Sequence, residues 1–242
     1  METLGNYSEV CSRSVYEGKL GTTGLEKVGE QPPEQTVSDL AGETLKVAVT
    51  VPSLSGTWPF QFGECLANMV QHFQGSKYEG EHEIKVFSHG GRVLPEVRHR
   101  LIGTSLGWGA THILMMTPEF TFPPDSIHRM LARGRAIVGI NYLRDIGSCE
   151  YSAYRGGETV KPDPVSPEIE EVDGVAIGMI LFNTPVFDVL DLPFFINKQI
   201  GESPGVSEDF VHFWEQCKEK GIPCVIDHAL SKEVKSYGEL WH

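Results

Sequence analysis

Two adjacent carboxylates, Glu208 and Asp209, stand at the start of a short amphipathic segment near the C-terminal end of the chain. We predict that this segment is a helix and that both acids lie in its first turn. A helix start exposes unpaired N–H groups and the positive end of the helix dipole, so carboxylates are stabilised there. One of them can serve as a general base at the rim of a cleft. The alternative is that Ser207 or Asp209 only caps the helix.

Other polar residues follow segments that we expect to be strands. In an open α/β sheet, ligands bind beyond the carboxyl ends of the strands. We therefore expect four such segments to face the same rim as the two acids: Pro52–Thr57, Thr117–Glu119, Asn141–Tyr142 and Asp227–His228.

The pattern of apolar residues alternates between strand-like and helix-like stretches. Short apolar runs predict strands at 45–51, 82–88, 112–116, 136–140, 172–182 and 223–227. Helical spacing predicts helices at 60–73, 94–108, from 124 onward, at 184–190 and at 209–220. This order predicts an α/β fold with a mostly parallel central sheet. Residues 144–168 are rich in glycine, proline and polar side chains and predict a long loop.

The first 44 residues differ in composition from the rest. They are polar, rich in Gly, Glu, Ser and Thr, and predict a flexible N-terminal arm, either extended or disordered. Residues 45–242 then form a single domain.

Net charge, apolar runs and cysteine content exclude some classes of function. The net charge of −13 argues against tight nonspecific binding to nucleic acid or anionic membranes, although a local basic cleft stays open. The chain has no run of about 18 apolar residues and no basic, apolar start, so we expect neither a membrane span nor a secretory signal. Five scattered cysteines without a CxxC pair indicate reduced thiols in a cytoplasmic protein.

Four segments, taken in order, resemble a known family. They are 110–125, 136–142, 172–181 and 207–221. The chain from residue 45 onward resembles the nucleotide-sugar glycosyltransferases of the GT-A fold, close to the small family-2-like enzymes of bacterial and phage genomes. The resemblance implies a GT-A-like, Rossmann-type sandwich.

The resemblance also implies an activity. A hexosyl or pentosyl group would pass from a nucleoside diphosphate sugar to the hydroxyl of an unidentified acceptor, with inversion. Asp209 would deprotonate the acceptor, and Glu208 would orient Asp209 or contact the acceptor. A sugar hydroxyl is a poor nucleophile, and a carboxylate within hydrogen-bond reach offsets this.

On the donor side, the resemblance assigns nucleotide-sugar binding to Pro52, Ser53, Ser55, Thr57, Arg98, Thr117, Glu119 and Asn141. For Arg98 the alternative is an ordinary surface or capping charge. The nearby aromatic residues Trp58, Phe60 and Phe62 either stack on a base or sugar or pack in the core.

The chain departs from the family at the metal site. The family's DxD motif offers acidic oxygens to Mn²⁺ or Mg²⁺, which neutralises the leaving diphosphate. Here the segment reads Thr117-Pro118-Glu119, and Ser236-Tyr237-Gly238 replaces the family's C-terminal histidine motif. Glu119 is the acidic ligand that remains in this segment. His228 and His242 are substitutes whose spacing gives no support, and each is more simply an ordinary polar histidine.

Three outcomes follow for this site. Glu119 binds the cation together with phosphate oxygens and water, or positive side chains such as Arg98, Arg144 or Lys232 carry the leaving-group charge. Alternatively, the site is degenerate and the chain is a binding or structural protein on an enzyme fold. A dinucleotide-binding enzyme is disfavoured because 52–57 contains no G-x-G-x-x-G.

Overall fold

A seven-stranded sheet forms the centre of the molecule in the computed structural model, which describes residues 44–53, 56–76, 81–145, 150–163, 165–166, 168–199 and 207–236. The strand order is β10-β15-β5-β12-β3-β1-β2. In chain order these strands are β1 (Leu45–Ser53), β2 (His82–Gly90), β3 (His112–Met116), β5 (Ile137–Gly139), β10 (Ile169–Val172), β12 (Met179–Asn183) and β15 (Cys224–Asp227).

Five of these strands run in the same direction. The pairs β1–β2, β1–β3 and β5–β15 are parallel, whereas β12 runs antiparallel between β3 and β5, and β10 antiparallel beside β15. The α/β class with a mostly parallel sheet is therefore confirmed. As a result β1, β2, β3, β5 and β15 all end at one border of the sheet, which we call the carboxyl edge.

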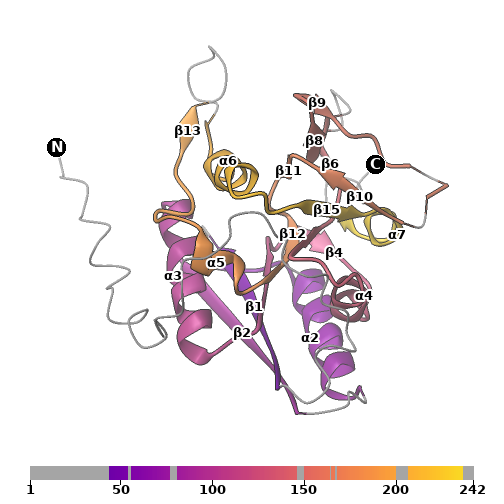
Figure 1. Cartoon of the computed structure of the whole chain (residues 1–242). Helices are drawn as coiled ribbons and strands as arrows, with labels where there is room; N and C mark the ends of the chain where they lie inside the picture. The colour runs from indigo at the N-terminus through magenta and orange to yellow at the C-terminus, as the bar shows by residue number, and fades with distance from the viewer. Residues whose placement is uncertain are drawn as a thin grey trace.

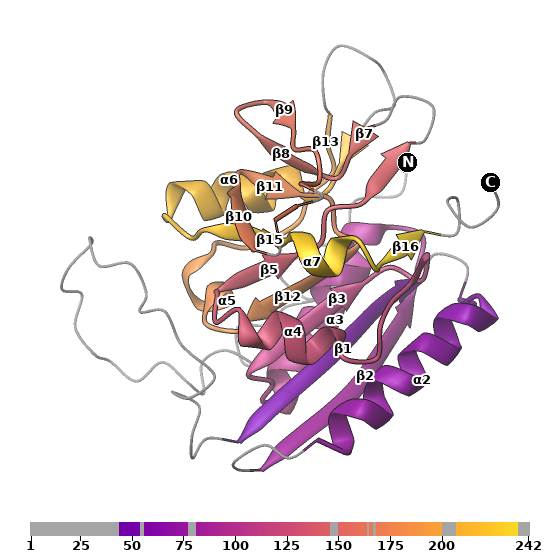
Figure 2. The same ribbon diagram turned by 90° about the vertical axis from the view of Figure 1, so that its right-hand side faces the viewer.

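Helices cover both faces of the sheet. They are α2 (Phe60–Gln74), α3 (Leu94–Trp108), α4 (Ser126–Ala132), α5 (Val186–Val189), α6 (Val211–Glu219) and α7 (His228–Ser231). Helices α3, α5 and α6 share one hydrophobic cluster, and α2, α4 and α7 share the other. Figures 1 and 2 show α3 and α2 on opposite sides of the strands.

The alternation of side chains along β3 explains the two clusters. Ile113 and Met115 join the cluster under α3, while Leu114 and Met116 join the cluster under α2. Every residue of β3 is buried, because both faces of a sandwiched sheet are covered. For a strand that is buried on both faces, the sequence pattern to expect is an uninterrupted apolar run, as in β3.

The two long helices match their expected ranges. In α2 the apolar residues Phe62, Leu66, Met69 and Phe73 recur at helical spacing and are all buried. Helix α3 ends at Gly109, whose φ of 83° is the left-handed conformation that glycine adopts at little cost.

The long loop predicted at 144–168 is wrong in part. It contains short antiparallel strands, namely β6 (Leu143–Asp145), β7 (Glu150–Tyr151), β8 (Ala153–Arg155) and β9 (Glu158–Thr159). Strand β6 pairs with β7, and β8 pairs with β9 and with β11 (Gly174–Val175). Strands of two or three residues are too short to show a period of two, so the sequence pattern could not reveal them.

The strand predicted at 172–182, with interruptions at Gly174 and Gly178, is divided in the structure into the end of β10, then β11 and β12. Glycines mark the breaks. A side chain at Gly174 would strike Trp214, and one at Gly178 would strike Tyr142. The backbone turns here so that these aromatic rings pack directly on it.

Helix α6 starts two residues later than predicted. Ser207–Glu208 forms β14, which pairs with β13 (Lys198–Gln199), and α6 begins after Phe210, whose side chain makes no cap hydrogen bond. The two acids therefore do not lie in the first turn, and Asp209 is not the N-cap residue. The side chain of Ser207 lies outside the description. A last pair joins β4 (Phe120–Thr121) to β16 (Lys235–Ser236) beside the exit of β3.

The described residues cover the predicted N-terminal arm and the cysteines only in part. Residues 1–43 of the predicted arm lie outside the description. Cys65, Cys217 and Cys224 are free thiols, and burial raises the pKa of Cys217 to about 12, so this thiol stays protonated. In the part of the chain that the structure describes, no helix is both long and apolar enough to cross a bilayer.

His112 in β3 makes the stability of this fold sensitive to acid. Burial lowers the pKa of its imidazole from 6.5 to about 4, so between these values the unfolded chain binds a proton that the folded chain does not. This contribution is complete above pH 6.5 and is lost as the pH falls toward 4. A shift of this size corresponds to about 3 kcal/mol.

We predict that His112→Asn flattens the decline in the free energy of unfolding between pH 7 and pH 4, measured by urea denaturation. An unchanged pH profile would contradict the prediction.

Candidate functional site

The predicted binding segments meet at the carboxyl edge. Strands β1 and β3 are neighbours in register, with Thr50 opposite Met115, so the loops that follow them leave the sheet side by side. The Thr117 N–H donates to the carbonyl of Gly178, 2.8 Å away, which fixes the exit of β3 against the start of β12. The sheet therefore brings together the segments 52–57 and 117–119, as the sequence predicts.

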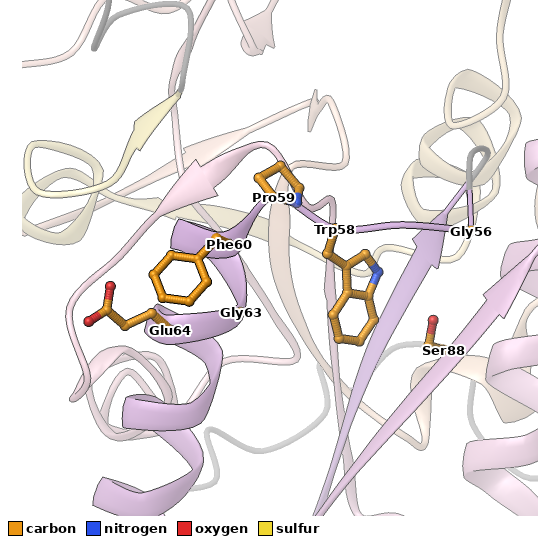
Figure 3. Close-up of a pocket in the computed structure, with 7 residues that line it drawn as sticks. All are labelled: Gly56, Trp58, Pro59, Phe60, Gly63, Glu64 and Ser88. Carbon is orange, nitrogen blue, oxygen red and sulfur yellow. The ribbon is translucent and has the colours of Figure 1, made fainter.

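A pocket of about 760 Å³ opens beside the exit of β1 (Figure 3). Its lining consists of Gly56, Trp58, Pro59, Phe60, Gly63, Glu64 and Ser88. The Trp58 ring lies between α2 and β1, and it meets the Phe62 ring edge-on at 5.6 Å between centroids. Phe62 is fully buried, whereas Phe60 is 80% exposed. Of the three aromatic residues, one is therefore core and two line the pocket.

The side chain of Ser53 forms hydrogen bonds within the loop that follows β1. The Ser53 hydroxyl accepts a hydrogen bond from the Gly56 N–H at 2.9 Å and donates to the Thr57 carbonyl at 3.2 Å. Pro52 and Ser53 are buried, Thr57 is exposed, and Ser55 lies outside the described residues. Within this segment, Thr57 is the described residue whose side chain reaches solvent.

Sequence reasoning missed several pocket residues. Glu64 and Gly63 come from the first turns of α2, and Ser88 comes from the end of β2. Ser88 reaches the pocket only because β2 pairs with β1 in parallel. The chain carries no local signal for that pairing.

The second feature of the carboxyl edge is a buried ion pair between Arg98 of α3 and Asp209, which precedes α6. The two residues are 111 positions apart, and the Arg98 Nη1 donates to Asp209 Oδ2. Arg98 is 3% exposed and Asp209 is 6% exposed. Burial lowers the pKa of the Arg98 guanidinium, and the Asp209 carboxylate opposes that effect. Among the described residues, the buried Arg98 Nε has no hydrogen-bond partner.

Aromatic residues surround this ion pair. The Phe195 ring centre lies 5.8 Å from Arg98 Cζ, and the same ring stacks on Phe213 of α6 at 5.2 Å. Next to Arg98, His99 donates from Nδ1 to the Pro95 carbonyl at 2.6 Å and accepts the Phe195 N–H at Nε2. Burial lowers the pKa of His99, so its imidazole is neutral and holds this loop without adding charge.

Two residues that follow β5 extend the site. The Tyr142 ring packs against Phe120 at 4.7 Å, and Tyr142 lies close enough to Arg98 to interact with its charge. The Arg144 Cζ lies 5.9 Å from the Phe210 ring centre, next to Asp209. Two guanidinium groups from different elements therefore flank the junction between β14 and α6.

Asn141 and His228 hold neighbouring loops. The Asn141 Nδ2 donates to the Val160 carbonyl at 2.7 Å, and its Oδ1 accepts the Ala153 N–H at 3.0 Å. The His228 Nε2 lies 2.9 Å from a carboxylate oxygen of Glu170. Asn141 is 1% exposed and His228 is 2% exposed. Neither can reach a ligand without giving up these bonds.

The described residues do not fit a divalent cation at the end of β3. Glu119 is exposed and Thr117 is half-buried, and only Glu119 of this segment carries a carboxylate. Across the described ranges, no three acidic, histidine or cysteine side chains are placed to hold a metal ion. The side chain of Glu208 and all of His242 lie outside the description.

Comparisons with known proteins give the fold but no family. No protein-family model matches the sequence, and no curated protein matches it. The crystal structure of A197 from STIV is similar, with a TM-score of 0.50 and 14% identity over 75% of this chain and 81% of that chain. This likeness shows a shared fold alone.

Two further solved structures are more distant. A mutant Drosophila β1,4-galactosyltransferase 7, in complex with manganese, UDP-Gal and xylobiose, has a TM-score of 0.45 and 13% identity over 80% of this chain and 70% of that chain. A protein named as a nucleotide-diphospho-sugar transferase from Desulfovibrio desulfuricans G20 has a TM-score of 0.39 and 10% identity over 76% of this chain and 79% of that chain. At these scores neither likeness carries an argument about this chain.

We predict that Arg98→Met lowers the free energy of unfolding by about 3–5 kcal/mol, because it leaves the Asp209 charge buried without its partner. The double variant Arg98→Met/Asp209→Leu should recover most of the loss, since it removes both charges. Urea denaturation measures both values. The control is Arg155→Met, whose ion pair with Glu170 joins a 59% exposed side chain to a 25% exposed one and should change stability by less than about 1 kcal/mol. Equal losses of stability for Arg98→Met and for the control would show that removing Arg98 does not leave an unpaired buried charge on Asp209.

Proposed function

We propose that this protein is a glycosyltransferase that moves a hexosyl or pentosyl group from a nucleoside diphosphate sugar to an acceptor hydroxyl. The observation that carries the proposal is the buried Arg98–Asp209 ion pair at the carboxyl edge. Such a pair is weak as a source of stability, and buried charged groups with a shifted pKa, such as Arg98, occur more often at functional sites. Its position agrees with the acid that the sequence resemblance assigns to proton transfer.

The pocket beside β1 supplies the place for the nucleobase. Its walls combine the partly exposed ring of Trp58 and the exposed ring of Phe60 with polar groups of Glu64 and Ser88. Aromatic faces stack on bases, and a few polar groups fix their orientation. A nucleotide bound here would extend its phosphates along the carboxyl edge toward the exit of β3.

Asp209 is the proposed general base. Arg98 donates to its Oδ2, and this contact leaves Oδ1 unengaged by that guanidinium nitrogen. The acceptor hydroxyl would therefore approach Oδ1. As the acceptor oxygen bonds to the anomeric carbon, the bond from that carbon to the diphosphate oxygen breaks and the hydroxyl proton passes to Asp209. A single displacement of this kind inverts the anomeric centre. Glu208, next in the chain, is proposed to contact the acceptor.

A second candidate function is nucleotide binding without transfer. The observation that favours it is the engagement of Asp209 by Arg98, together with the absence of a metal-fitting group among the described residues. Both candidates predict that UDP or GDP binds. They differ in turnover, so a screen of nucleotide sugars for donor hydrolysis and transfer separates them.

We predict that Asp209→Asn abolishes transfer while the folded protein still binds the nucleotide. The amide keeps the shape and still accepts the Arg98 hydrogen bond, but it cannot take the acceptor proton. Transfer is measured by release of the nucleoside diphosphate in the presence of acceptor. Asp191→Asn serves as the control, because Asp191 has an 84% exposed side chain and forms an exposed ion pair with Lys220 at 3.6 Å. Normal turnover by Asp209→Asn would remove Asp209 from the mechanism.

We predict that Trp58→Ala weakens UDP binding about tenfold, since base–aromatic stacking contributes about 1–3 kcal/mol. Calorimetry measures the dissociation constant. Trp108→Ala is the matched control, because Trp108 lies at the opposite end of α3 from the carboxyl edge. If both variants bind UDP like the unmodified protein, the nucleobase does not occupy this pocket.

A further inference from the structure

The leaving diphosphate requires compensating positive charge, and the described residues offer arginines where the sequence resemblance implies a metal ion. We propose that Arg98 and Arg144 bind the diphosphate directly, without a divalent cation. This inference rests on the proposed function.

The two arginines reach the same place from different elements. Arg98 comes from α3 and contacts Asp209, whereas Arg144 comes from β6 and lies over the ring of Phe210. Tyr142 connects this group to the exit of β3, because its ring interacts with Phe120 at 4.7 Å. The cations therefore stand beside the strand end toward which a bound nucleotide would extend its phosphates.

Arg98 has spare hydrogen-bonding capacity. Its Nη1 is used by Asp209, but its buried Nε has no partner in the described part of the chain. A buried donor without an acceptor costs free energy, and a phosphate oxygen is a suitable acceptor. A guanidinium offers five N–H donors in a fixed fork, so one group can hold Asp209 and a phosphate oxygen together.

Arg144 is more accessible. Its side chain is 33% exposed, and it faces Glu150 at 3.6 Å across a partly solvated gap. An ion pair of this kind contributes little, so a diphosphate that carries more charge than one carboxylate can compete with Glu150 for Arg144.

The residue at position 117 supports the same conclusion. An acid at this position would repel a diphosphate unless a metal ion lay between them. Thr117 removes one of the two acids that the family has here, so that Glu119 is the one negative charge in the segment 117–119. A neutral residue at this place fits direct binding by arginine better than binding through a cation.

The test is calorimetric titration of the full chain with UDP and with inorganic pyrophosphate, in EDTA and in MnCl₂. We expect both ligands to bind in EDTA, with dissociation constants within about threefold of those in Mn²⁺. Arg144→Gln should weaken both at least about tenfold, as expected for loss of a charge-assisted contact. Arg155→Gln is the control, because its ion pair with Glu170 is 2.9 Å long and lies at the β8–β10 contact. It should leave both affinities unchanged.

The outcomes separate the two proposals. Nucleotide binding that is lost in EDTA and restored by Mn²⁺ overturns the metal-free site but leaves the transferase proposal standing. Equal affinities for Arg144→Gln and Arg155→Gln also overturn it. If UDP, and GDP titrated in the same way, fail to bind under every condition, both proposals fail. Circular dichroism on each variant confirms that any loss is not unfolding.

Discussion

The contact between Arg98 and Asp209 is the constraint on which the arrangement of the carboxyl edge depends. It joins α3 to the start of α6, two elements that cover the same face of the sheet. Removing two charges from water costs several kcal/mol per ion, and only good geometry and further contacts compensate for that cost. Phe195 supplies some of these further contacts, because its ring lies against the Arg98 guanidinium and stacks on Phe213.

This contact also explains the local structure around α6. Because Asp209 turns toward Arg98, it does not cap the helix, and the first regular turn begins only at Val211. The preceding residues then extend as β14 and pair with β13. A helix cap and a buried ion pair compete for the same carboxylate, and here the stronger, charge-assisted contact prevails.

Strongly periodic or uniformly apolar segments could be predicted from the sequence, and weakly patterned or long-range features could not. Helices α2 and α3 and strand β3 were predicted nearly to the residue, because burial imposes a regular pattern on each. The antiparallel direction of β12 was not predicted, because an apolar run in the sequence does not show in which direction its strand pairs. The sequence placed Asp209 among the site residues but could not reveal its pairing with Arg98, since the contact spans 111 positions. Ser88 could not be predicted as a pocket residue, because it lines the pocket only through the pairing of β2 with β1.

The enzyme and the scaffold hypotheses differ in what they require of Arg98. A protein that only keeps a fold gains nothing from a buried guanidinium, since apolar residues of similar size stabilise such a position as well or better. It gains still less from an Nε donor that no described residue satisfies. A site that receives an anionic ligand needs such a donor, held in place by Asp209 and Phe195 before the ligand arrives. The unsatisfied donor therefore favours a ligand-binding site over a purely structural ion pair.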